Sequence, residues 1–113
     1  MENTMKIEDL KDKQTDVNID VKVIYDKMEE KEFKGKRSKT LVVANVDSQP
    51  GDPTALLDVF DDDIDKYKFQ DKMRLTNAYA KIITTKRGEQ PLITYGFDGN
   101  KLIGSYEHIT EEK

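Results

Sequence analysis

The chain has no cysteine and no tryptophan, and histidine occurs once among its 113 residues. Without cysteine there can be no disulfide, no thiol nucleophile and none of the common structural zinc sites. No apolar run approaches the roughly 18 residues that a transmembrane helix needs, and no signal peptide is recognisable. We therefore expect a soluble, intracellular protein that has no membrane partner and needs no cofactor or metal.

Catalytic motifs are also lacking. His108 has no serine, cysteine or second histidine at a catalytic spacing, and no glycine-rich loop leads from a strand into a helix. The acidic run at 61–65 fails as a calcium loop, because Lys66 stands where that loop needs glycine and Lys72 where it needs glutamate. We expect Asp61 to cap a short helix instead, and we predict that the protein is not an enzyme.

Length and composition fit one small domain with segregated charge. At 113 residues, the chain can bury roughly 65% of its unfolded surface around a single core. Charged residues make up 37% and the formal net charge is -4. Basic residues gather at 27–39 and 81–87, whereas aspartate gathers at 58–65. The negative total argues against indiscriminate binding of polyanions, but the two basic segments could still contact phosphates.

Alternation of apolar and polar residues predicts strands along most of the chain. The clearest strand begins at Val17 and places every second residue inward: Val17, Ile19, Val21, Val23 and Tyr25. Further strands are expected at 40–46, 54–60 and 72–84, and a fifth from Pro91 onward. Ahead of the first strand, Ile7 and Leu10 are expected to be buried beneath it, and the short helix between strands three and four should direct Ile64 and Tyr67 into the core.

The outward residues of the later strands point to a binding surface. The fourth strand changes parity near Asn77, which predicts a bulge that turns Tyr79, Lys81 and Ile83 outward. After a hairpin loop at 85–89, the fifth strand is expected to place Leu92 and Thr94 inward and to place Ile93 and Tyr95 outward. Phe60 ends the third strand, also outward. Aromatic rings on three neighbouring strands of a small barrel would form a platform on which unpaired bases can stack.

Four short motifs follow one another between residues 5 and 97. They are Lys6-Ile7-Glu8-Asp9-Leu10-Lys11 with Val17-Asn18-Ile19, then Asp58-Val59-Phe60-Asp61-Asp62, Ala78-Tyr79-Ala80 and Leu92-Ile93-Thr94-Tyr95-Gly96. In this order they resemble the archaeal and eukaryotic single-stranded DNA-binding proteins related to replication protein A. The order of strands and helix likewise resembles the oligonucleotide/oligosaccharide-binding (OB) fold.

The resemblance implies an all-β protein with a five-stranded OB-fold Greek-key barrel at 17–97 and a short helix between strands three and four. A polar lid segment at 1–16 would precede the barrel and an extension at 98–113 would follow it. Single-stranded DNA would be the partner, bound with little sequence specificity in replication, recombination or repair. The implied stacking residues are Phe60, Tyr79 and Tyr95, with Ile83 near a further stacking position. Phosphate contacts are expected from Lys34, Lys36, Arg37, Lys81, Lys86 and Arg87.

Two other functions stay open at this point. The barrel could bind protein as a subunit of a replication or repair complex, which the acidic total and the outward Leu56 and Ile93 favour. It could also bind RNA through the same surface, since stacking does not distinguish the two nucleic acids.

Overall fold

The computed structural model describes residues 5–33, 35–86, 88–98 and 101–109. Along this part of the chain, the elements are the 3-10 helix η1 (Ile7–Asp9), β1 (Gln14–Tyr25), β2 (Lys31–Phe33), β3 (Lys36–Asn45), β4 (Thr54–Phe60), the 3-10 helix η2 (Asp61–Asp65), β5 (Lys72–Thr85), β6 (Gly88–Asp98), β7 (Lys101–Ile103) and β8 (Ser105–His108). No helix within these residues is long and apolar enough to cross a membrane.

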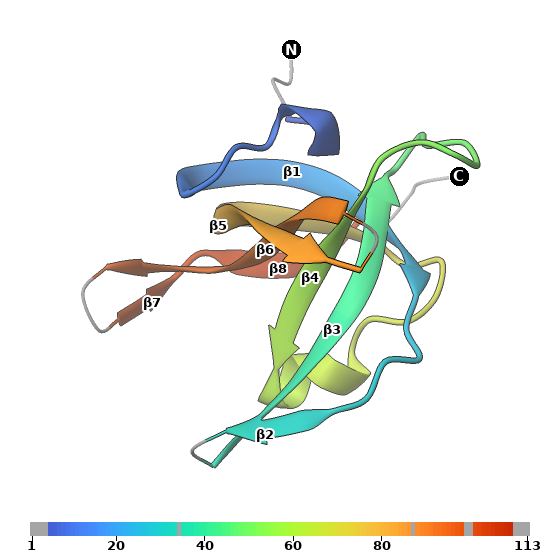
Figure 1. Ribbon diagram of the computed structural model, residues 1–113. Helices are drawn as coiled ribbons and strands as arrows, with labels where there is room; N and C mark the ends of the chain where they lie inside the picture. Colours follow the sequence, from blue (N-terminus) through green and yellow to red (C-terminus); the bar gives the residue numbers. More distant parts are fainter. Residues whose placement is uncertain (1–4, 34, 87, 99–100, 110–113) are drawn as a thin grey trace.

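Within the described residues, β1, β3, β4, β6 and β5 form a closed five-stranded barrel (Figure 1). β1 pairs with β3 and β5, β3 pairs with β4, and the antiparallel β5–β6 pair closes the ring. β4 and β6 run parallel. This strand order is that of the OB fold, so the predicted fold class is confirmed. The helix between strands three and four is the 3-10 helix η2. The N-cap residue of η2 is Phe60, which makes no side-chain capping hydrogen bond, whereas the prediction placed the cap at Asp61, the first residue inside the helix.

The core of the barrel follows the alternation of β1 until the end of that strand. Val17, Ile19, Val21 and Val23 are buried as predicted. Tyr25 is not, and the prediction of an inward side chain is wrong. The pairing of β1 with β3 shifts between Val23 and Tyr25, which places Tyr25 opposite the outward Val42. A one-residue shift of this kind moves a side chain to the other face of the sheet.

The bulge predicted in the fourth barrel strand is confirmed. Asn77 has a φ of 54°, and the pairing of β1 with β5 shifts at this point. Leu75 is buried before the bulge and Ala78 and Ala80 after it, so Tyr79 turns away from the core.

The predicted faces of the fifth barrel strand are wrong. Ile93 is fully buried, and it lies opposite the inward Ala80. The reason is the hairpin, because Thr85 pairs directly with Gly88 and leaves a two-residue turn where a longer loop was expected. The register then gives each residue of β6 the face of its partner on β5, so Leu92 lies opposite the outward Lys81.

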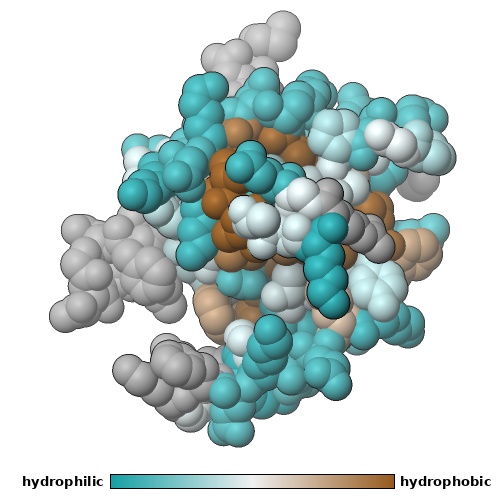
Figure 2. Space-filling view, in the orientation of Figure 1, coloured by the Kyte–Doolittle hydropathy of each residue, from teal (hydrophilic) through white to brown (hydrophobic). Residues whose placement is uncertain are grey.

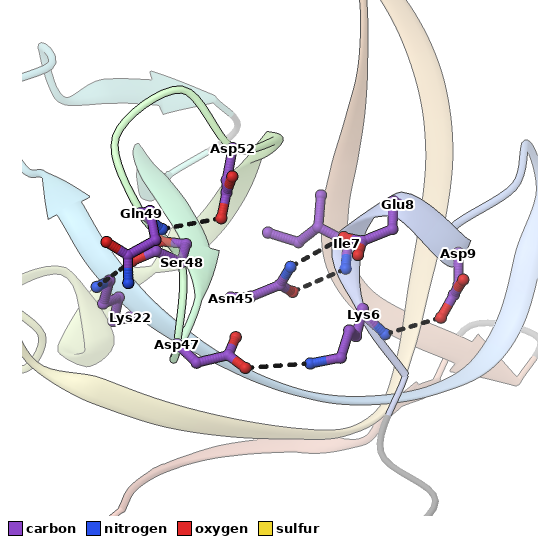
Figure 3. A network of polar contacts seen from close by, with 10 residues as sticks. All are labelled: Lys6, Ile7, Glu8, Asp9, Lys22, Asn45, Asp47, Ser48, Gln49 and Asp52. Atoms are coloured by element: carbon purple, nitrogen blue, oxygen red, sulfur yellow. Dashed lines mark hydrogen bonds and ion pairs between the residues drawn. The ribbon is translucent and has the colours of Figure 1, made fainter.

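The segment before β1 is fastened to the end of β3 by a buried asparagine (Figure 3). The side-chain oxygen of Asn45 accepts a hydrogen bond of 2.9 Å from the backbone N–H of Ile7, and its amide donates one of 2.9 Å to Glu8. Ile7 and Leu10 are buried in the core, as predicted. After the barrel, β7 pairs with the end of β6, and this pair projects from the barrel (Figure 1). The chain then returns, and β8 pairs with β5.

Candidate functional site

An open groove of about 590 Å³ lies on the outer side of β1, β3 and β4. Its apolar lining comes from Ile24, Tyr25, Met28, Val42 and Leu56, and its polar lining from Thr54, Thr85, Lys86 and Gln90. Met28 belongs to the segment that joins β1 to β2, and Lys86 belongs to the turn between β5 and β6. The two basic segments at 27–39 and 81–87, from which phosphate contacts were expected, therefore each contribute a residue to its walls.

Exposed apolar side chains mark this groove. Tyr25 is 47% exposed and Met28 is 39% exposed, and both lie on its lining. Figure 2 shows hydrophobic side chains in the middle of the face that carries β3, β4 and β6, with hydrophilic ones around them. A small protein gains nothing in stability from exposing such groups together, so a patch of this kind usually marks a binding surface.

Tyr25 and Met28 were missed by the sequence reasoning. One signal for Tyr25 was present, because Val23, Ile24 and Tyr25 are three consecutive apolar residues that break the alternation. The same kind of break correctly indicated the bulge near Asn77.

The predicted stacking residues Phe60 and Tyr95 lie together, with a third ring that was not predicted. The centroids of Phe60 and Tyr95 are 5.5 Å apart at an interplanar angle of 27°, and those of Tyr95 and Tyr106 are 4.3 Å apart at 10°. Tyr95 packs against the core and its hydroxyl donates a hydrogen bond to Asp63, so the prediction that its side chain points outward is wrong. Tyr95 is thus the common member of two stacked pairs, and Phe60 is the partly exposed end of the row.

Tyr79 and Ile83 lie on another surface. Tyr79 is opposite Thr94, and Ile83 is opposite Gln90, which lines the groove. Because Tyr95 is opposite the buried Ala78, Tyr79 and Tyr95 point to different faces of the β5–β6 pair. The structure therefore does not bring the three predicted rings onto one continuous platform.

The predicted phosphate ligands are placed as follows. Lys86 is exposed on the rim of the groove, and Lys81 is exposed on the outer face of β5. Arg37 is exposed on β3, and its guanidinium lies 3.4 Å from the carboxylate of Glu30. Lys36 is the first residue of β3, opposite Phe33. Lys34 and Arg87 lie outside the described residues.

An acidic residue stands among these groups. Asp58 is outward on β4, and one of its carboxylate oxygens accepts a hydrogen bond of 3.1 Å from the hydroxyl of Thr40. Burial raises the pKa of Asp58, while the Thr40 hydrogen bond and the positive charges of Lys81 and Lys31 act in the opposite direction. The carboxylate is therefore less well solvated than an exposed one.

Two buried tyrosines, Tyr67 and Tyr106, should make the fold sensitive to high pH. Burial raises the pKa of Tyr67 from its ordinary 10.0 to about 12, with Asp63 and Glu107 adding to the effect, and burial raises the pKa of Tyr106 well above 10.0. Because the fold favours the neutral phenol, this stability is present below pH 10 and is lost as pH rises through the raised pKa. For Tyr67 the rise corresponds to a loss of about 3 kcal/mol in the free energy of unfolding.

We expect the urea midpoint to fall steeply between about pH 10 and 12, and to fall less in Tyr67→Phe. The Tyr67 hydroxyl is buried without a hydrogen-bond partner among the described residues, so this variant should also be at least as stable at pH 7. Tyr25→Phe is the matched control, because Tyr25 is exposed. If Tyr67→Phe and Tyr25→Phe lost equal stability over this range, burial of Tyr67 would not be the cause.

Comparison with known proteins supports the fold assignment. No family model matches the sequence, and no curated protein matches it. Among solved structures, the chain is similar to Schizosaccharomyces pombe Pot1pC, crystallised with bound ssDNA of sequence CGGTTACGGT. The TM-score is 0.58 at 14% sequence identity, over 99% of this chain and 90% of that one. Strand order and structural similarity together identify the protein as an OB fold.

Proposed function

We propose that the protein binds single-stranded DNA in the groove over β1, β3 and β4, with little sequence dependence along most of the strand. The observation that carries this proposal is the exposed, apolar groove with Tyr25 on its lining and Lys86 on its rim. The similarity to Pot1pC, which was crystallised with ssDNA, supports it. So does the sequence resemblance to proteins related to replication protein A. We further propose that it acts without catalysis or a cofactor, inside the cell, in replication, recombination or repair.

Bases would be bound by stacking and phosphates by charge. Tyr25 offers an exposed ring in the groove, and Phe60 offers the partly exposed end of the row that continues through Tyr95 to Tyr106. Tyr95 would then support Phe60, while Tyr79 and Ile83 would contact the strand where it passes over β5. Each stacked base contributes about 1–3 kcal/mol and every base has a flat face, so this mode does not depend on sequence.

The phosphates would follow the basic side chains around the groove. Lys86, Lys81 and Arg37 are exposed, and Lys34, Lys36 and Arg87 are proposed from the sequence to add to them. Neutralising a phosphate on a single strand contributes about -0.7 to the slope of log K against log salt concentration. Three such contacts give a slope of about -2, so affinity should fall roughly 20-fold between about 50 and 200 mM salt.

A titration tests the proposal directly. An oligothymidine of about 12 nucleotides should quench the tyrosine fluorescence and shift the anisotropy of a labelled strand, with the salt slope given above. Duplex DNA should bind more weakly, because its bases are already stacked on one another. Absence of binding to single strands at low salt by both methods would contradict the proposed function.

Binding of a protein partner is the second candidate, and the apolar lining of the groove favours it. Tyr25, Met28 and Leu56 could receive apolar side chains of another chain as well as bases. A partner that copurifies at fixed stoichiometry, from a protein that binds no single strand, would decide for this function. Competition between DNA and RNA strands of matched sequence decides which nucleic acid is preferred.

A further inference from the structure

A carboxylate lies on the outer surface of β4, where a negatively charged strand is proposed to pass. Asp58 is on the same face of β4 as Leu56, which lines the groove, and Phe60. Phe60 is the first ring of the stacked row Phe60, Tyr95 and Tyr106, which we call the ring row. Residues two apart on a strand are separated by roughly 6.6 Å, so a base over either neighbour is close to the carboxylate. Because a carboxylate repels phosphate, the presence of Asp58 on this surface calls for a role other than phosphate binding.

The surroundings of Asp58 suit a role as an acceptor of two hydrogen bonds. One carboxylate oxygen accepts from Thr40, whereas no donor among the described residues bonds the other oxygen. A carboxylate offers about four lone-pair sites, so both oxygens can still accept from a ligand. Lys81 and Lys31 carry positive charges nearby, which reduces the repulsion between this group and a phosphate. Because burial raises the pKa of Asp58, its charged form is incompletely solvated and gains from added donors.

The bases differ in what they can offer to two acceptor oxygens. Unpaired bases are commonly recognised on their Watson–Crick edges. Guanine presents two adjacent donors there, N1–H and the 2-amino group, whereas each of the other bases sets an acceptor beside its donor. An acceptor facing a carboxylate is repelled, so only guanine can form the two parallel hydrogen bonds.

We propose that Asp58 reads one guanine of the bound strand through its Watson–Crick edge. The proposal rests on the proposed function and adds one position at which base identity matters. A bidentate contact between a side chain and a base discriminates by about 5- to 150-fold against the wrong base. Binding elsewhere along the strand remains indifferent to sequence, because it depends on stacking and phosphates.

The test compares oligothymidine of about 12 nucleotides with the same strand carrying one central guanine, adenine or hypoxanthine. We expect the guanine strand to bind about 5- to 150-fold tighter than oligothymidine, and the adenine strand to show no such gain. Hypoxanthine keeps N1–H but lacks the 2-amino group, so its gain should be intermediate. Asp58→Asn should abolish the preference for guanine and leave the affinity for oligothymidine equal or higher, because a negative charge is removed.

Glu107→Gln is the control for removing one carboxylate, since Glu107 is exposed on β8 and is not part of the groove lining. It should keep the preference. A thermal melt checks that Asp58→Asn is folded, which we expect because Tyr106 bonds the backbone carbonyl of Asp58 and not its side chain. Equal affinity of the wild type for all four strands would overturn the role of Asp58 and leave the proposed function intact. Absence of binding to every strand would overturn both.

Discussion

Tyr25→Ala is expected to weaken binding of oligothymidine by about 5- to 150-fold, the equivalent of one lost stacking contact of about 1–3 kcal/mol. Tyr25 is the exposed aromatic residue on the groove lining, and its backbone lies at the end of β1 beside Val42. Tyr25→Phe keeps the flat ring and should keep most of the affinity. Anisotropy titrations of the three proteins at one salt concentration make the comparison.

Phe69 provides the matched control for this experiment. It is 57% exposed, more than Tyr25, and it is not on the groove lining. Phe69→Ala removes an exposed ring of similar size, so it should leave the affinity unchanged. If Phe69→Ala and Tyr25→Ala had equal effects, or if Tyr25→Ala had none, the groove would not be where bases stack. Because Tyr25 is exposed, Tyr25→Ala should unfold at nearly the wild-type urea concentration.

The sequence predicted most of the barrel because burial leaves a clear pattern on a strand. Val17 to Val23 alternate without interruption, and the parity change around Asn77 located a bulge that the structure confirms. Tyr25 was misplaced because an apolar ring fits the inward pattern as well as a groove, and residue type does not distinguish the two. The three consecutive apolar residues Val23, Ile24 and Tyr25 do break the alternation, but the strand ends there and no later residue shows to which face the chain has shifted.

The faces of the fifth barrel strand needed information that its own residues do not carry. Leu92 and Ile93 are both apolar, so alternation fits either register. The choice is made by the two-residue turn from Thr85 to Gly88, where the sequence favoured a longer loop. A change in loop length by an odd number of residues, here from five to two, reverses every side chain that follows, which explains why Ile93 and Tyr95 were both assigned to the wrong face.

The ring row depends on a contact between segments that are distant in sequence. Tyr106 reaches Tyr95 only because β8 pairs with β5, with Leu75 opposite Tyr106. Nothing in the local pattern of residues 101–106 specifies that pairing. The candidate site therefore combines residues that the sequence could identify, such as Phe60 and Lys86, with supports that only the tertiary structure reveals.

Gly104→Ala is expected to destabilise the protein by about 2–5 kcal/mol, because Gly104 is held tightly where β8 meets β5. Its φ is +88°, and a Cβ at this position would lie 2.6 Å from the backbone oxygens of both Asn77 and Thr76. The left-handed backbone costs a residue with a side chain about 1–2 kcal/mol, and crowding of this kind costs about 1–3 kcal/mol more. The free energy of unfolding of a small domain is about 5–15 kcal/mol, so a loss of this size should be clear in a urea titration.

Gly51→Ala separates the two contributions to that loss. Gly51 has a similar φ of +94°, but no atom lies within 4 Å of the added Cβ, so only the backbone cost of about 1–2 kcal/mol should appear. The destabilisation by Gly104→Ala beyond that by Gly51→Ala then measures how closely β8 packs against β5. Because β8 carries Tyr106, undocking would also remove the support behind Tyr95 and Phe60, and the near-ultraviolet circular dichroism of the tyrosines should weaken in Gly104→Ala alone. Equal destabilisation by the two substitutions, with the tyrosine signal intact, would show that β8 can separate from Asn77 at no cost and that the ring row does not depend on it.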